Sequence, residues 1–107
     1  MSAPFDKNEY HPLDGFAFEA LAVSTTAVAF TAATYAPTTG TPAVMAKCSV
    51  ETAAVRYRVD GTDPTATVGE VLEPGDELAV WGTMDIRSIR FIRRDGVDAT
   101  LNTHFYR

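Results

Sequence analysis

Side chains that could act in catalysis are few in this sequence, and their spacing forms no catalytic pattern. His11 and His104 are the two histidines and Cys48 is the single cysteine. Catalysis needs a nucleophile, a base or a metal in a fixed arrangement, and no Cys or His pair here has zinc-site spacing. Alternation places Cys48 on the apolar side of its strand, so Cys48 is expected to act as a small buried hydrophobic residue. Alternation places His104 on the outer side of the last strand, where it is expected to be a surface histidine. We therefore predict that the protein is not an enzyme.

Acidic residues gather between positions 60 and 77, mostly in predicted loops. They are Asp60, Asp63, Glu70, Glu73, Asp76 and Glu77. Calcium prefers carboxylates and carbonyls on such loops, but no EF-hand spacing follows here. Asp-Gly and Asp-Pro are also ordinary turn-forming pairs. We predict neither a metal nor a cofactor.

Two other features fit the binding of another protein. The arginines Arg56, Arg58, Arg87, Arg90, Arg93 and Arg94 form a basic group. One interpretation is a solvated strand face paired with acidic residues, where each exposed ion pair contributes little to stability. An equally good interpretation is a polar subunit interface, where arginine is enriched. Trp81 is predicted to lie outside the core, where it packs under a loop or the arm, anchors a partner, or serves as a platform for a sugar.

The elements that carry these residues are predicted to be short β-strands. In residues 55–59, Val55, Tyr57 and Val59 alternate with Arg56 and Arg58. Only the two-residue period of a β-strand puts the apolar side chains on one side and the arginines on the other. Further strands are predicted at 18–23, 27–31, 43–50, around 78–81, at 88–94 and at 99–105. Turns are predicted at Asp60-Gly61, Pro74-Gly75 and Asp95-Gly96, and a short helix or turn around residues 83–85.

This pattern predicts an all-β fold for a chain of 107 residues, the length of one domain. About seven or eight short strands, with turn signals every 8–12 residues or so, are typical of a β-sandwich. We predict a single antiparallel β-sandwich, Ig-like or jelly-roll-like, over residues 17–107, preceded by an extended N-terminal arm at residues 1–16. The residues predicted to bind a partner are Phe5, Tyr10, His11, Trp81, Arg56, Arg58 and Arg90.

Charge and hydropathy restrict the partners. The formal net charge is −5, which argues against nucleic acid, because phosphates are neutralised by a clustered basic face. The most apolar stretch, residues 17–36, is interrupted by Glu19 and by several Ser and Thr residues, so it is too polar to span a membrane. The first residues have no apolar run of signal-peptide length, and we expect the protein to be made in the cytoplasm.

Residues 55–69 resemble a local motif of chitobiase C-terminal-type Ig-like domains. In that motif an aromatic strand is followed by Asp-Gly-Thr-x-Pro-Thr, which matches Asp60-Gly61-Thr62-Asp63-Pro64-Thr65. Asp60-Gly61 turns the strand and Pro64 fixes the next corner. The resemblance implies a carbohydrate-binding module as one alternative, using Trp81 and loop residues around Tyr35.

A broader resemblance, from Phe18 to Tyr106, is to small proteins of tailed bacteriophages. The stretches that carry it are 20–28, 30–35, 50–53, 56–62 with Pro64-Thr65, 72–76, 90–93 and 98–101. The resemblance implies a virion structural protein located on the capsid surface. A capsid decoration (cement) protein is expected first, bridging and stabilising major capsid proteins as a homo-oligomer, with a trimer favoured. A head–tail, neck or tail accessory protein is the alternative within the virion.

Overall fold

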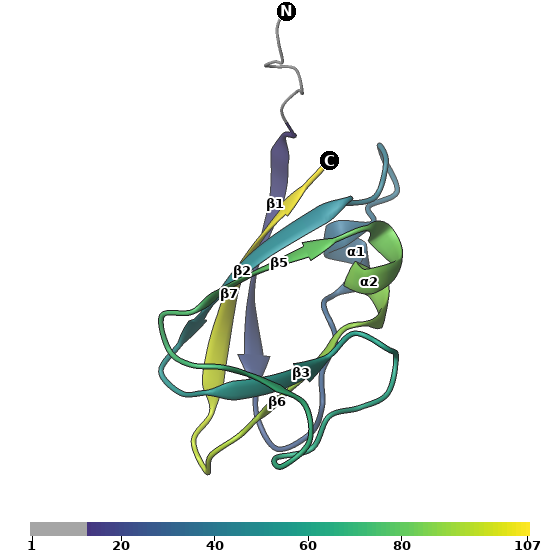
Figure 1. The fold of residues 1–107 in the computed structure, drawn as a ribbon. Helices are drawn as coiled ribbons and strands as arrows, with labels where there is room; N and C mark the ends of the chain where they lie inside the picture. The colour runs from purple at the N-terminus through teal and green to yellow at the C-terminus, as the bar shows by residue number, and fades with distance from the viewer. Residues whose placement is uncertain (1–12) are drawn as a thin grey trace, which may run out of the picture.

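Two antiparallel sheets form the fold of residues 13–107, the part of the chain that the computed structural model describes (Figure 1). The elements are β1 (Gly15–Val23), α1 (Ala32–Tyr35), β2 (Met45–Glu51), β3 (Val55–Arg58), β4 (Glu70–Leu72), β5 (Glu77–Trp81), α2 (Thr83–Ser88), β6 (Arg90–Arg93) and β7 (Ala99–Tyr106). One sheet has the order β1-β7-β2-β5 and the other β4-β3-β6. The predicted all-β sandwich is confirmed.

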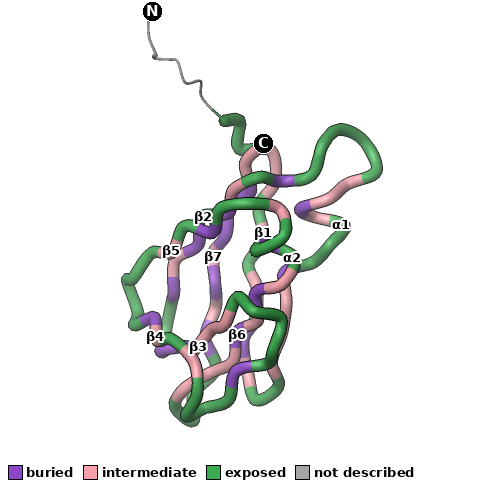
Figure 2. Tube along the Cα trace, turned by 45° about the vertical axis from the view of Figure 1, so that its right-hand side comes forward, coloured by how far each residue is buried: buried purple, intermediate pink, exposed green. Residues whose placement is uncertain are grey.

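Alternation along the strands builds the core between the two sheets. In β7 the buried residues are Ala99, Leu101, Thr103 and Phe105, and the residues between them face outward. Figure 2 shows buried and half-buried segments along β7, and of the residues that face outward only His104 is exposed.

A cluster of aromatic rings links the sheets across the core. The ring of Phe30 lies 5.2 Å from the ring of Phe105 on β7 and 5.3 Å from that of Phe91 on β6, in edge-to-face geometry. Tyr35 adds a ring 6.0 Å from that of Phe105. Such pairs stabilise a core beyond the area that they bury. A loop and a short helix therefore supply rings that connect the two sheets.

Cys48 lies on the core side of β2 and is 1% exposed. Burial raises the pKa of its thiol to about 12 because the thiolate would lose its hydration. We predict that a thiol reagent at about pH 8 leaves folded protein unmodified and labels it fully after unfolding, as mass spectrometry would show. Native labelling at the rate of a small free thiol would contradict this placement.

The structure differs from the sequence prediction between β1 and β2. Residues 27–31, predicted as a strand, form only an isolated bridge in which Val28 exchanges two backbone hydrogen bonds with Phe91. The chain then enters α1, a helix that the alternation had not indicated. The Glu19 carboxylate on β1 accepts hydrogen bonds from the backbone N–H and the hydroxyl of Thr31. This contact holds the start of α1 against β1, and a continued strand would lose it.

Several element boundaries also differ from those predicted. β1 begins at Gly15, so the last two residues of the predicted arm belong to the sheet. The strand predicted at 88–94 is shorter because α2 continues to Ser88 and β6 spans Arg90–Arg93. Val59, predicted to lie on the same side as Val55 and Tyr57, is 41% exposed because it lies just outside β3, where regular pairing ends.

Candidate protein-binding site

The outer face of the four-stranded sheet carries an aromatic surface at one end. Register pairing puts Gly15, Tyr106, Met45 and Trp81 in one row across the four strands. The next row holds Phe18, His104, Lys47 and Ala79. Their sequence neighbours Ala46, Val80 and Phe105 are buried, so these residues face solvent. We call the group formed by Phe18, Met45, Trp81, His104 and Tyr106 the aromatic face.

Two members of the aromatic face are unusually exposed for their type. Trp81 is 63% exposed and Phe18 is 51% exposed. The ring of Phe18 lies 4.9 Å from that of His104, which lies 6.5 Å from that of Tyr106. A contiguous group of large apolar side chains in water is typical of an interaction surface. Tryptophan and tyrosine are also the residue types that most often anchor protein interfaces.

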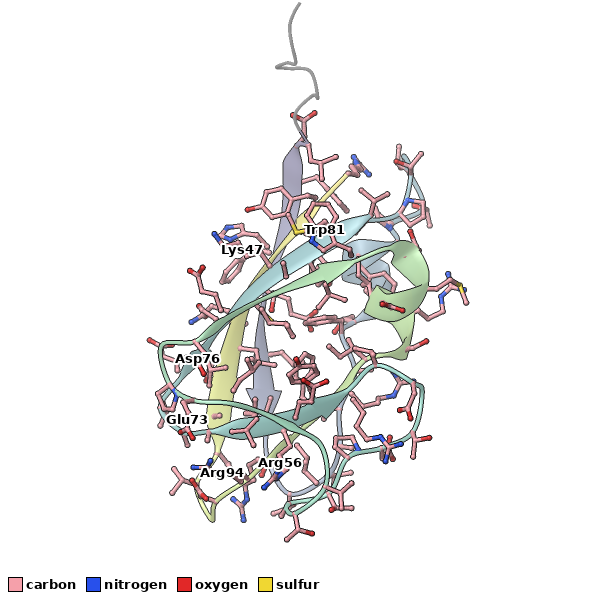
Figure 3. The ribbon with its side chains drawn as sticks, in the orientation of Figure 1. Lys47, Arg56, Glu73, Asp76, Trp81 and Arg94 are labelled. Carbon is pink, nitrogen blue, oxygen red and sulfur yellow. The ribbon has the colours of Figure 1, made fainter. Side chains whose placement is uncertain are left out.

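The other half of the same sheet face is polar. Its rows contain Ala20, Asn102, Ser49 and Glu77, followed by Ala22, Thr100 and Glu51. Lys47 and Glu77 form an exposed ion pair of 3.7 Å at the border between the halves. Figure 3 places Trp81 and Lys47 toward the end of the sheet where β1 begins. The apolar surface therefore lies beside the point where the N-terminal residues join the sheet.

The backbone around Trp81 holds this residue in place. Trp81 ends β5, and Gly82 follows with φ +94°, a conformation that favours glycine and directs the chain into α2. The Gly82 N–H donates a hydrogen bond of 2.7 Å to the carbonyl of Val44, which joins this turn to β2. Because the backbone at Trp81 is already held in place, binding a partner through Trp81 would cost little backbone conformational entropy.

The predicted arginine contacts lie on the other sheet. Arg56, Arg58 and Arg90 share the outer face of the three-stranded sheet, where Arg58 pairs with Arg90. Each guanidinium is bonded within the chain: Arg56 to the carbonyls of Ala66 and Gly69, Arg58 to Asp60, and Arg90 to the carbonyls of Arg87 and Ile89. These contacts favour the solvated strand face, and a role of these arginines in partner binding stays a prediction.

Arg56 fastens the loop between β3 and β4 to the sheet. Its Nε and Nη1 donate hydrogen bonds of 2.9 and 2.7 Å to the carbonyls of Ala66 and Gly69. Because a bond from a charged donor contributes roughly 1.5–3 kcal/mol, we predict that Arg56→Ala makes the loop open more easily by about 1–3 kcal/mol. Hydrogen exchange of the amides between residues 59 and 69 measures this opening. Arg87→Ala on α2 is the control, and equal exchange in the two variants would contradict the role of Arg56.

Several acidic side chains, including some of those predicted in loops, are bonded within the chain. Glu73 pairs with Arg94 at 2.8 Å, and Asp60 accepts hydrogen bonds from Arg58 and from the Thr62 N–H. Hydrogen bonds from Ser24 and Arg93 lower the pKa of Asp98 below its usual value. Within residues 13–107, no three His, Cys, Asp or Glu side chains are grouped so that they would hold a metal. No helix in that range is long and apolar enough to cross a membrane.

Three predicted contact residues, Phe5, Tyr10 and His11, lie outside the described residues. Tyr35, around which loop residues were expected to serve a sugar site, is 5% exposed and packs in the core. The carbohydrate alternative itself stays a prediction. Phe18, Met45 and Tyr106 were missed as site residues. Alternation shows which way each of them faces, but only the strand order β1-β7-β2-β5 puts them on one sheet face with Trp81. Met45 lies opposite Trp81, Tyr106 lies opposite Met45, and Phe18 lies on the far edge strand opposite His104.

Comparisons of the chain with protein-family models, with curated proteins and with solved structures found no significant match. The aromatic face is therefore the feature of the described residues from which a function is inferred. Its residues lie in two neighbouring rows across the four strands, and Trp81 and Phe18 among them are largely exposed. Such a surface is suited to contact with another protein.

Proposed function

We propose that this protein is a structural component of a tailed-bacteriophage virion, a capsid decoration protein that helps to hold the shell together. It binds neighbouring virion proteins, which include copies of itself, through the aromatic face, with Trp81 as the main anchor. The observation that carries this proposal is the exposure of Trp81 and Phe18 on one sheet face. The resemblance of residues 18–106 to small phage proteins supplies the virion context.

The construction of the domain supports a role in a repetitive assembly. A single cysteine excludes an internal disulfide, so the small domain is stabilised without a covalent cross-link and would gain stability from contact with a partner. A shell offers many equivalent sites, and contacts that are weak singly become strong when several are made at once. A compact β-domain with one apolar surface is therefore sufficient to reinforce a shell of identical subunits.

Counting the copies of this protein in purified virions tests the proposal. A decoration protein is expected in the hundreds, in proportion to the major capsid protein, because it occupies every equivalent junction. Quantitative mass spectrometry against isotope-labelled peptides gives the ratio. A copy number that fits one ring of subunits would assign the protein to the neck or tail. Absence of the protein from virions would contradict a structural role.

Binding to a glycan array distinguishes the carbohydrate alternative. The proposal predicts no glycan bound above background by the wild-type protein. Glycan binding that disappears in Trp81→Ala would instead assign the aromatic face to sugar recognition.

A further inference from the structure

We infer that the aromatic face binds the N-terminal segment, residues 1–12, of a second copy of this chain. The inference rests on the proposed function and deepens it, because it names the partner at the same surface. Neighbouring copies would then be linked by exchanged N-terminal segments.

The position of the aromatic face supports this occupant. The described chain joins the sheet at Asp14, whose backbone exchanges hydrogen bonds of 2.9 and 3.0 Å with that of Arg107. These bonds extend the β1–β7 ladder next to Gly15 and Tyr106, in the row that ends at Trp81. The apolar half of the sheet and the attachment point of the segment are therefore at the same end of the molecule (Figure 3).

The composition of the segment matches the surface. Residues 1–12 read Met-Ser-Ala-Pro-Phe-Asp-Lys-Asn-Glu-Tyr-His-Pro, with Phe5 and Tyr10 as two large aromatic side chains. Five residues of extended chain span about 17 Å, while the row from Gly15 to Trp81 crosses three strand spacings, about 14 Å. The two rings are therefore spaced to contact opposite sides of the aromatic face.

Charge is complementary at the border of the surface. The segment contains Asp6 and Glu9, and Lys47 lies beside the aromatic face. The present partner of Lys47 is Glu77, in an exposed pair of 3.7 Å. If Lys47 exchanged Glu77 for a carboxylate of the segment, the free-energy cost would be small, because exposed ion pairs contribute little to stability.

A second copy fits better than the chain's own segment. The segment is attached at Asp14, which is paired with Arg107 at the end of the β1–β7 ladder. To cover the aromatic face of its own domain, the segment would have to reverse direction over the sheet, and the fixed φ of Pro12 restricts such a reversal. The aromatic face of a second copy requires no reversal. Reciprocal exchange of this kind yields closed oligomers.

Trp81 is the only tryptophan in the sequence, so its fluorescence reports directly on this surface. The test compares the full-length wild type with the full-length double variant Phe5→Ser/Tyr10→Ser. Lys7→Ser/Asn8→Ser is the control in the same segment. Sedimentation and Trp81 emission are followed over a wide range of protein concentration.

The wild type and the control are expected to form oligomers at high concentration and to dissociate on dilution, with a red shift of Trp81 emission. The Phe5→Ser/Tyr10→Ser variant is expected to dissociate at least 30-fold or so more readily, the effect of losing two anchors at an interface. Wild-type monomers at every concentration with unshifted emission would overturn the inference. An emission change in the variant without any concentration dependence would also overturn it, and would assign the surface to the chain's own segment.

Shell binding separates this inference from the proposed function. If the inference alone fails, wild-type monomers still decorate shells in a manner that depends on Trp81. If the proposed function alone fails, oligomers form through Trp81 but do not bind shells.

Discussion

Replacing Phe105 with alanine is expected to lower the free energy of unfolding by about 3–5 kcal/mol, the usual cost of removing a buried phenylalanine. Phe105 is fully buried in β7 and packs its ring against those of Phe30 and Tyr35. These two residues come from the segment between β1 and β2, so the cavity would also loosen the contact between that segment and the sheet. A domain of this size is stable by only about 5–15 kcal/mol.

Phe18→Ala on the neighbouring strand is the matched control for this substitution. Phe18 is 51% exposed and belongs to the aromatic face, so its removal is expected to cost less than about 1 kcal/mol. Urea unfolding followed by circular dichroism measures both variants on one scale. Similar losses of stability for the two substitutions would show that the inner and outer faces of this sheet are wrongly assigned.

Trp81→Ala is expected to weaken binding to the protein partner by about 30-fold or more, since anchors of this type commonly contribute at least about 2 kcal/mol. The exposed indole contacts little of the fold, so the free energy of unfolding is expected to change by less than about 0.5 kcal/mol. Met84→Ala on α2 is the control, because Met84 is 67% exposed but lies outside the aromatic face. Equal loss of binding in the two variants would indicate a general effect of surface hydrophobicity.

Much of the fold follows from local patterns in the sequence. The alternation of Ala99, Leu101 and Phe105 and that of Ala46, Cys48 and Val50 predict which side chains are buried, and the structure confirms them. Apolar and polar residues alternate with a period of two in these strands because each strand has one buried face and one face toward solvent.

The segment between β1 and β2 could not be predicted in this way. Residues 27–31 have the composition of a strand, yet only Val28 is paired. The contact between Glu19 and Thr31 joins residues twelve positions apart, and it favours a helix start over a longer strand. Such tertiary contacts override local preference and leave no periodic signal.

The aromatic face was predictable only in part. Alternation indicates that Trp81 and His104 face outward, as the structure confirms. It contains no information on the order of the strands, which places Phe18, Met45 and Tyr106 beside them. The arginines differ in this respect. Arg56, Arg58 and Arg90 do share one face of the three-stranded sheet, but each guanidinium is already hydrogen-bonded to neighbouring parts of its own chain.

The most direct test of the central claim is a binding titration on shells that lack this protein. Purified shells are incubated with increasing amounts of wild type, Trp81→Ala or Met84→Ala, and the bound protein is quantified after sedimentation. The wild type and Met84→Ala are expected to saturate the shells at the same concentration, while Trp81→Ala needs a concentration about 30-fold higher or more. Saturation by Trp81→Ala at the wild-type concentration, or no binding by the wild type, would contradict the claim.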